Sequence, residues 1–264
     1  MKRLCLLALF ACVGCTTVPK PSDEALHDLA PTGKLRAAIN VGNPVLAKRG
    51  VGGGEPGGVS VDLARELAAR LGVPIEFVVL DSAGKVVAAA RTGAWDVAFV
   101  AIDPKRSEDI EQSPPYVVIE GAYVVPEASP IRDSAEVDRA GNRIVVGLGS
   151  AYDLFLASTI KLAELVRVPV SPLVVQTMVA QRYEVGAGVK QQLEADAKRT
   201  PGVRLLPGRF MVINQAMASQ HGKRAGAQYV REFIEEMKAS GFVARALERH
   251  GVQGEAVAPA GDAR

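Results

Sequence analysis

The chain has 264 residues, of which 48% are hydrophobic and 23% charged, enough for two globular domains of about 100–150 residues each. This balance excludes a disordered chain and a coiled coil. The 31 basic and 29 acidic residues leave a formal charge of only +2, without a basic stripe, and aromatic residues make up 5%. No nucleic-acid partner is therefore expected.

The amino-terminal segment has the pattern of an export signal. Residues 1–14 begin with Lys2 and Arg3, continue with an apolar run over 4–13 and end just before Cys15. The apolar run is too short to cross a bilayer as a mature helix. All three cysteines lie within the first 15 residues, so the rest of the chain has no thiol for a disulfide, a metal or a nucleophile. We expect residues 1–14 to be a signal peptide that directs the protein to the periplasm.

The residues around Cys15 suggest a lipid anchor. Cys12-Val13-Gly14-Cys15 resembles a bacterial lipobox, in which the cysteine thiol receives a diacylglycerol and becomes the new amino terminus. The sequence departs from that pattern at Cys12, where leucine is usual. We expect lipidation of Cys15 and anchoring to the membrane, with ordinary cleavage at the same place as the alternative. Residues 15–33, which include three prolines, would then form a tether.

From residue 34 onward, segments typical of strands and helices alternate. The predicted elements are strands over 35–41, 74–80 and 96–101 and helices over 61–71 and 85–91. Ser60 is expected to cap the first helix. Residues 50–58 contain six glycines and a proline and must form a turn or loop, but no Gly-Lys-Ser/Thr follows, so this is not a phosphate loop. This order of elements predicts a parallel sheet covered on both faces.

A second series of the same kind follows a predicted strand over 116–125. Its expected elements are strands over 143–148, 164–168 and 184–189, helices over 151–160, 172–181 and 190–198, a last strand over 210–218 and final helices over 225–239 and 242–249. Two similar series predict two α/β lobes. Because one strand and two helices are left over, we expect the chain to return to the first lobe, so that two crossings form a hinge.

Seven short motifs occur in order and at the spacing of a known family. They are Lys34-Leu35-Arg36 with Asn40-Val41-Gly42-Asn43-Pro44, Gly58-Val59-Ser60-Val61-Asp62-Leu63-Ala64, Leu71-Gly72-Val73, Gly93-Ala94-Trp95-Asp96-Val97-Ala98, Pro104-Lys105-Arg106, Ser113-Pro114-Pro115-Tyr116 and Gly149-Ser150-Ala151-Tyr152. Through these motifs the chain, from about Gly33 to Val252, resembles the family 3 extracellular solute-binding proteins of amino-acid-type ABC transporters.

The resemblance implies an α/β, two-lobe periplasmic-binding-protein fold, with each lobe an α/β sandwich and a two-strand hinge between them. Lobe 1 would comprise residues 34–125 plus 210–252 and lobe 2 residues 126–209, followed by a flexible tail over 253–264. The implied function is capture of a small carboxylate-bearing solute, an amino acid or a related molecule, in the interlobe cleft and delivery to an ABC permease. We expect a monomer that performs no catalysis and needs no cofactor or metal.

Two other functions remain open. Periplasmic cyclohexadienyl dehydratases resemble these proteins, and Asp103, Glu120 and Lys190 are titratable groups that could lie near the cleft. A receptor that passes its closed state to a sensor partner is the other alternative. Ligand binding without turnover would exclude the enzyme, and neighbouring genes for a permease and an ATPase would favour transport over sensing.

The resemblance also implies where the ligand is held. Arg106 follows the strand over 96–101 where the family places an arginine that grips the ligand carboxylate with its planar fork, although spacing alone fits an exposed loop arginine. Gly149, Ser150 and Ala151 follow a strand and open a helix, so their backbone N–H groups would face the cleft, unless Ser150 only caps its own helix. Asn43, after the first strand, completes this predicted group.

Departures from the family pattern leave the ligand open. The family usually supplies an aspartate for the ligand's amino group near Val189, which is neutral here, and the usual aromatic platform after Pro44 is missing. Asp103 or Glu120 could replace that aspartate, although acids in loops or at strand ends are commonly plain solvated groups. A standard amino acid is therefore in doubt.

Overall fold

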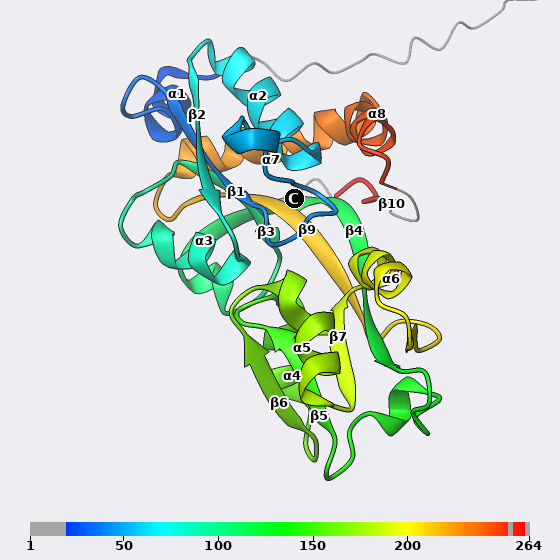
Figure 1. The fold of residues 1–264 in the computed structure, drawn as a ribbon. Helices are drawn as coiled ribbons and strands as arrows, with labels where there is room; N and C mark the ends of the chain where they lie inside the picture. The colour runs from blue at the N-terminus through cyan, green and yellow to red at the C-terminus, as the bar shows by residue number, and fades with distance from the viewer. Residues whose placement is uncertain (1–19, 253–255, 262–264) are drawn as a thin grey trace, which may run out of the picture.

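The computed structural model describes residues 20–252 and 256–261 (Figure 1). All its strands belong to one sheet, in the order β2-β1-β3-β9-β4-β7-β5-β6, with β8 and β10 both pairing with β4. Figure 1 shows helices α1, α2, α3, α7 and α8 around one half of this sheet and α4, α5 and α6 around the other half. We call the two halves the first and the second lobe.

The first lobe is a parallel α/β unit. Its elements are β1 (Leu35–Asn40), α2 (Val59–Leu71), β2 (Ile75–Leu80), α3 (Ala83–Ala90) and β3 (Val97–Ala101). Strand β1 pairs in parallel with β2 on one side and with β3 on the other. All five residues of β3 are buried, because helices cover both faces of the sheet, so this strand reads as a continuous apolar run.

The second lobe repeats this plan. Its elements are β5 (Arg143–Gly147), α4 (Ala151–Thr159), β6 (Glu164–Val168), α5 (Val174–Gln181), β7 (Val185–Val189), α6 (Lys190–Arg199) and β8 (Val203–Leu205). Strand β5 pairs in parallel with both β6 and β7. Short 3₁₀ helices elsewhere in the chain lie at Val51–Gly53, Arg106–Glu108, Ser134–Glu136 and Ser171–Leu173.

Two long strands connect the lobes. Strand β4 (Ile110–Pro126) and strand β9 (Met211–Gln220) pair with each other in antiparallel orientation. On their outer sides, β9 pairs with β3 of the first lobe and β4 pairs with β7 of the second. After β9 the chain returns to the first lobe, where α7 (Arg224–Ala239) packs on α1 and α8 (Phe242–Arg249) on α2.

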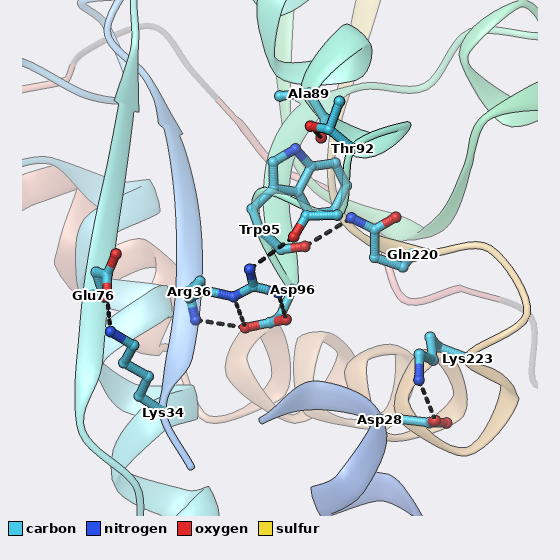
Figure 2. Close-up of polar contacts among 11 residues, drawn as sticks. Asp28, Lys34, Arg36, Glu76, Ala89, Thr92, Trp95, Asp96, Gln220 and Lys223 are labelled. Carbon is cyan, nitrogen blue, oxygen red and sulfur yellow. Dashed lines mark hydrogen bonds and ion pairs between the residues drawn. The ribbon is translucent and has the colours of Figure 1, made fainter. Parts of the chain in front are cut away.

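A buried ion pair joins β1 to the start of β3 (Figure 2). The carboxylate of Asp96, only 3% exposed, accepts hydrogen bonds from the backbone N–H of Arg36 at 2.8 Å and from its Nη2 at 2.6 Å. The same guanidinium donates to the carbonyl of Gly93, and Gln220 of β9 donates to the carbonyl of Trp95 at 2.7 Å. These contacts hold β1, β3 and β9 together and so position the loops that follow β1 and β3.

The prediction that residues 15–33 form a tether is wrong for residues 20–33, which the structure describes. Ser22 caps helix α1 (Asp23–Leu29), its Oγ accepting from the N–H of Ala25 at 3.1 Å. Leu29 is fully buried, and α1 packs against α7. This short helix buries Ala25 and Leu29, spaced one turn apart, so it belongs to the first lobe.

The expected flexible tail over 253–264 also needs correction. Strand β10 (Ala256–Val257) pairs with β4, and Ala258 is buried. The N–H of Gly261 donates to Glu235 of α7 at 3.1 Å. Residues 256–261 therefore pack on the first lobe, because β4 offers them a free edge at this end. Residues 253–255 and 262–264 lie outside the described part.

Ser60 is not a helix cap. Helix α2 begins at Val59, and Gly58 stands at its N-cap with φ 129°. A Cβ atom at Gly58 would lie 2.3 Å from the carbonyl oxygen of Leu46, so the backbone path requires glycine. Ser60 is buried instead, with its Oγ 3.1 Å from the hydroxyl of Tyr116.

The predicted signal peptide (1–14) and lipidated Cys15 lie outside the described residues. Within 20–252 and 256–261, none of the helices is both long enough and apolar enough to span a membrane.

Candidate functional site

A cavity that opens to solvent lies between the two lobes, and the space along its walls, open solvent included, is about 620 Å³. It is bordered by the carboxyl ends of β1, β3, β5 and β7, which is where ligands bind in open α/β sheets. The two lobes contribute both polar and apolar groups. Its polar side chains are Asn40, Asn43, Ser82, Arg106, Ser150, Tyr152, Ser171, Gln192 and Gln215.

Arg106 is the cation of the cavity. Its side chain is buried, with the residue only 3% exposed, and it donates from Nη1 to the carbonyl of Ala101 and from Nη2 to the carbonyl of Gly149, both at 2.9 Å. Among the described residues it forms no ion pair. Burial lowers the pKa of Arg106 to about 10, with a weak opposing effect from Asp103, so the guanidinium stays protonated at neutral pH.

A buried charge without a partner is expensive, because the low-dielectric interior cannot replace the lost hydration. The guanidinium has five N–H donors, and the two carbonyls described above are neutral acceptors. Arg106 therefore lies where an incoming anion would complete its coordination. The turn that aims Arg106 into the cavity is held by Asp103, whose carboxylate accepts from the N–H of Lys105 at 2.9 Å and whose carbonyl accepts from the N–H of Arg106.

The amino terminus of α4 reaches the cavity from the second lobe. Ser150 and Ala151 both line the cavity, and the Oγ of Ser150 accepts from the N–H of Asp153 at 3.0 Å. Ser150 therefore caps its own helix in addition to facing the cavity. The N–H of Gly149, predicted to face the ligand, donates at 2.9 Å to the carboxylate of Asp153 instead. Because Asp153 satisfies this donor from inside α4, Gly149 presents only its carbonyl, to Arg106.

Asn43, expected to bind the ligand, lies in the turn after β1. It lines the cavity, and its Oδ1 atom is buried and has no hydrogen-bond partner among the described residues. The turn that carries it is shaped by Asn40, whose Oδ1 accepts from the N–H of Gly42 at 3.0 Å. Asn43 thus offers a neutral acceptor to a ligand.

The structure does not bring Asp103 or Glu120 to the cavity lining. Asp103 is half-exposed and occupied by its own turn. Glu120 accepts from Arg209 at 2.6 Å and from Lys190 at 2.9 Å, and these contacts, with Arg209 first, lower the pKa of its carboxyl. The expectation that either acid replaces the missing amine partner is wrong, because nearer groups in their own lobes occupy both carboxylates.

Several lining residues were not predicted from the sequence. Ser82 caps α3. Gln215 lies buried on β9, and a polar side chain within an apolar strand is a sequence signal that could have indicated a lining residue. Tyr152, the last residue of one quoted motif, is buried, and burial raises the pKa of its hydroxyl. Ser171 and Gln192 follow β6 and β7, and their residue types alone do not indicate a ligand site.

The lobes meet at one edge of the cavity through glycines. A Cβ atom built on Gly84 of α3 would lie 3.3 Å from the Cα of Gly149, and one on Gly149 would lie 2.9 Å from the Cα of Gly84. Together with the hydrogen bond from Arg106 to Gly149, this contact joins the first lobe to the second. No acidic side chain lines the cavity, and no group of three or more His, Cys, Asp or Glu within the described ranges could hold a metal ion.

Comparison with known proteins places the chain in a family. Residues 35–253 match the model of the bacterial extracellular solute-binding proteins, family 3. The chain belongs to this family, and the predicted resemblance is confirmed. None of the curated proteins matches the sequence closely enough to be counted as a relative.

Solved structures with the same fold support this assignment. The solute receptor for L-cysteine of Neisseria gonorrhoeae is 24% identical, with a TM-score of 0.76 over 87% of this chain and 95% of the receptor. A mutant of ArgBP from T. maritima is 20% identical, with a TM-score of 0.75 over 87% of this chain and 100% of that protein. An ancestral amino-acid-binding protein, a precursor of cyclohexadienyl dehydratase, is 21% identical, with a TM-score of 0.73 over 85% of this chain and 98% of the other. These likenesses confirm the two-lobe α/β fold.

Proposed function

We propose that this solute-binding protein captures a small carboxylate-bearing solute between its lobes and delivers it to an ABC permease. The observation that carries the proposal is Arg106, a buried guanidinium at the cavity with no ion-pair partner among the described residues. A carboxylate would supply the missing charge and accept two parallel hydrogen bonds. Amino-acid-binding proteins among the structural relatives agree with a carboxylate-bearing ligand.

Ligand binding would work through a change in the lobe arrangement. Strands β4 and β9 are the only long strands that link the two lobes in the described part of the chain, so we propose that they act as the hinge. A ligand held by Arg106 and by the Ser150 end of α4 contacts both lobes at once. It therefore favours the closed arrangement, which a permease can recognise.

Ligand binding without catalysis is better supported than the other candidate function, that of a dehydratase-type enzyme. The acids and the lysine that could have served as proton carriers, Asp103, Glu120 and Lys190, do not line the cavity. The titratable side chains that do line it are Arg106 and Tyr152, whose pKa values lie well above neutrality. Incubation with a bound carboxylate, followed by NMR, should return the molecule unchanged, whereas any product would favour the enzyme.

Calorimetry on Arg106 variants tests the proposal. A carboxylate found by a thermal-shift screen of amino acids and organic acids should bind Arg106→Ala about 30-fold to several thousand-fold more weakly, since loss of one partner of a buried charge pair costs about 2–5 kcal/mol. Arg106→Lys should recover only part, because an ammonium lacks the planar fork. The melting temperature without ligand should change little. An Ala variant within about threefold of wild type would remove Arg106 from the site.

The family is extracellular, and we propose that this member is a periplasmic monomer anchored through a lipidated Cys15. Two or more acyl chains would hold it on the membrane. Wild-type protein should partition with membranes and Cys15→Ala should be soluble. Wild-type protein that is wholly soluble would contradict the anchor and leave the binding proposal intact.

A further inference from the structure

We infer that the solute is a small carboxylate with a single negative charge and no ammonium group, carrying a neutral hydrogen-bond donor such as a hydroxyl or an amide N–H. A 2-hydroxy acid has this chemistry, and a free amino acid does not. The inference rests on the proposed function, because it assumes that Arg106 holds the carboxylate.

The charge balance of the cavity disfavours a ligand with an ammonium group. Its lining contains one guanidinium and no carboxylate. A monoanion bound to Arg106 would leave the closed cavity neutral. A zwitterionic amino acid would bring an additional ammonium, and the cavity would then hold an uncompensated positive charge in a low-dielectric environment.

Asp153 and Glu120 are already engaged by groups other than a ligand. Asp153 is buried behind the α4 terminus, where it accepts from the N–H of Gly149 and from the Nε of Arg167, both at 2.9 Å. Glu120 is held between Lys190 and Arg209. Moving either carboxylate to an ammonium would break these contacts and leave a cation without its partner.

The rest of the cavity wall near Val189 and Asn43 is uncharged. Val189, at the end of β7, lines the cavity and is nearly buried, so this part of the wall is apolar. The buried Oδ1 of Asn43 is an acceptor without a partner among the described residues. An orphan acceptor is satisfied by a hydroxyl or an amide N–H, without any need for charge. The ligand's second polar group is therefore a hydrogen-bond donor, and the charge balance of the lining requires that donor to be neutral.

Pairs of probes with the same carbon skeleton test the inference. We would compare lactate with alanine, 2-hydroxyisocaproate with leucine, and 3-phenyllactate with phenylalanine, by calorimetry at neutral pH. The full chain would first be unfolded and refolded to remove any solute bound during expression. In at least one pair, the hydroxy acid should bind at least ten times more tightly than its amino acid. Arg106→Ala should weaken this binding.

Two other outcomes would distinguish failure of this inference from failure of the proposed function. If the amino acids bind as tightly as the hydroxy acids or more tightly, and Arg106→Ala weakens them, the inference is wrong and the proposed function stands. If none of the six carboxylates binds, or if binding is insensitive to Arg106→Ala, the carboxylate proposal itself fails and the inference fails with it.

A matched pair of variants at Val189 supplies the second measurement. Val189→Asp adds a carboxylate at the cavity wall, and Val189→Asn adds an amide of nearly the same shape without charge. In Val189→Asp the ratio of hydroxy-acid to amino-acid affinity should fall at least tenfold relative to Val189→Asn. Circular dichroism and melting temperature would verify that both variants fold. A ratio within threefold in the two folded variants would overturn the inference.

Discussion

At the scale of single residues, the partly exposed Arg36 and the buried Arg106 differ in the groups that accept their hydrogen bonds. Arg36 forms a bidentate pair with the nearly fully buried Asp96, and the hydrogen bond to this carboxylate raises the pKa of Arg36. Arg106 has carbonyl acceptors and, among the described residues, no acid. The same residue type therefore forms an ion pair in one place and lines the cavity in the other, because of the two only Arg36 has a carboxylate within hydrogen-bonding distance.

Removing Arg36 should destabilise the first lobe. Arg36→Met leaves Asp96 buried without its cation, and we expect a loss of about 2–4 kcal/mol in the free energy of unfolding, discounted for the partial exposure of Arg36. Urea denaturation measures this. The double variant Arg36→Met with Asp96→Val should recover part of the loss. Equal or greater loss in the double variant would show that the pair is not the source of the effect.

At the scale of elements, the local sequence pattern predicted elements with local signals well and elements that depend on distant partners poorly. Strand β6 and helix α8 have the predicted bounds, because their apolar spacing and their turn residues are local signals. Helix α1 and strands β8 and β10 were not predicted. Each has seven residues or fewer, and each is stabilised by a partner far away in the sequence, such as α7 or β4.

Helix α1 should contribute measurably to stability. Leu29→Ala removes a fully buried side chain at the α1–α7 contact, and we expect a loss of about 2–5 kcal/mol by chemical denaturation. Glu24→Ala, at an exposed position of the same helix, is the matched control and should change stability by less than about 0.5 kcal/mol. If Leu29→Ala changes the free energy of unfolding no more than Glu24→Ala does, α1 does not stabilise the first lobe and serves as a tether.

At the scale of the whole molecule, the two lobes approach each other closely at two glycines. Gly84 and Gly149 allow α3 and the loop after β5 to touch, which brings Arg106 within 2.9 Å of the carbonyl of Gly149. A larger side chain at Gly84 would hold the lobes apart. Gly149 also has φ 69°, a left-handed conformation that disfavours other residues, so Gly84 is the cleaner position to change.

Gly84→Val should impair closure without unfolding the protein. The branched side chain adds bulk where even a Cβ would lie 3.3 Å from Gly149, so ligand affinity should fall at least tenfold and compaction on ligand addition should be reduced in small-angle scattering. Ala88→Val, at an exposed position of the same helix, controls for the change in helix propensity. Normal compaction in Gly84→Val would show that the glycine contact is not required for closure.

The sequence by itself determined the family and the two-lobe fold, since these follow from local periodicity and from motifs whose spacing is read along the chain. Arg106 was singled out by the family resemblance, because its spacing alone fits an exposed loop arginine. Only the tertiary structure decided which polar groups face the cavity. Glu120 is drawn to Arg209, 89 residues away, and the N–H of Gly149 to Asp153, whereas Asn43 keeps a buried acceptor without a partner among the described residues. The physical reason is that a side chain's charge and hydrogen bonds are satisfied by neighbours in space, and the sequence order does not reveal those neighbours.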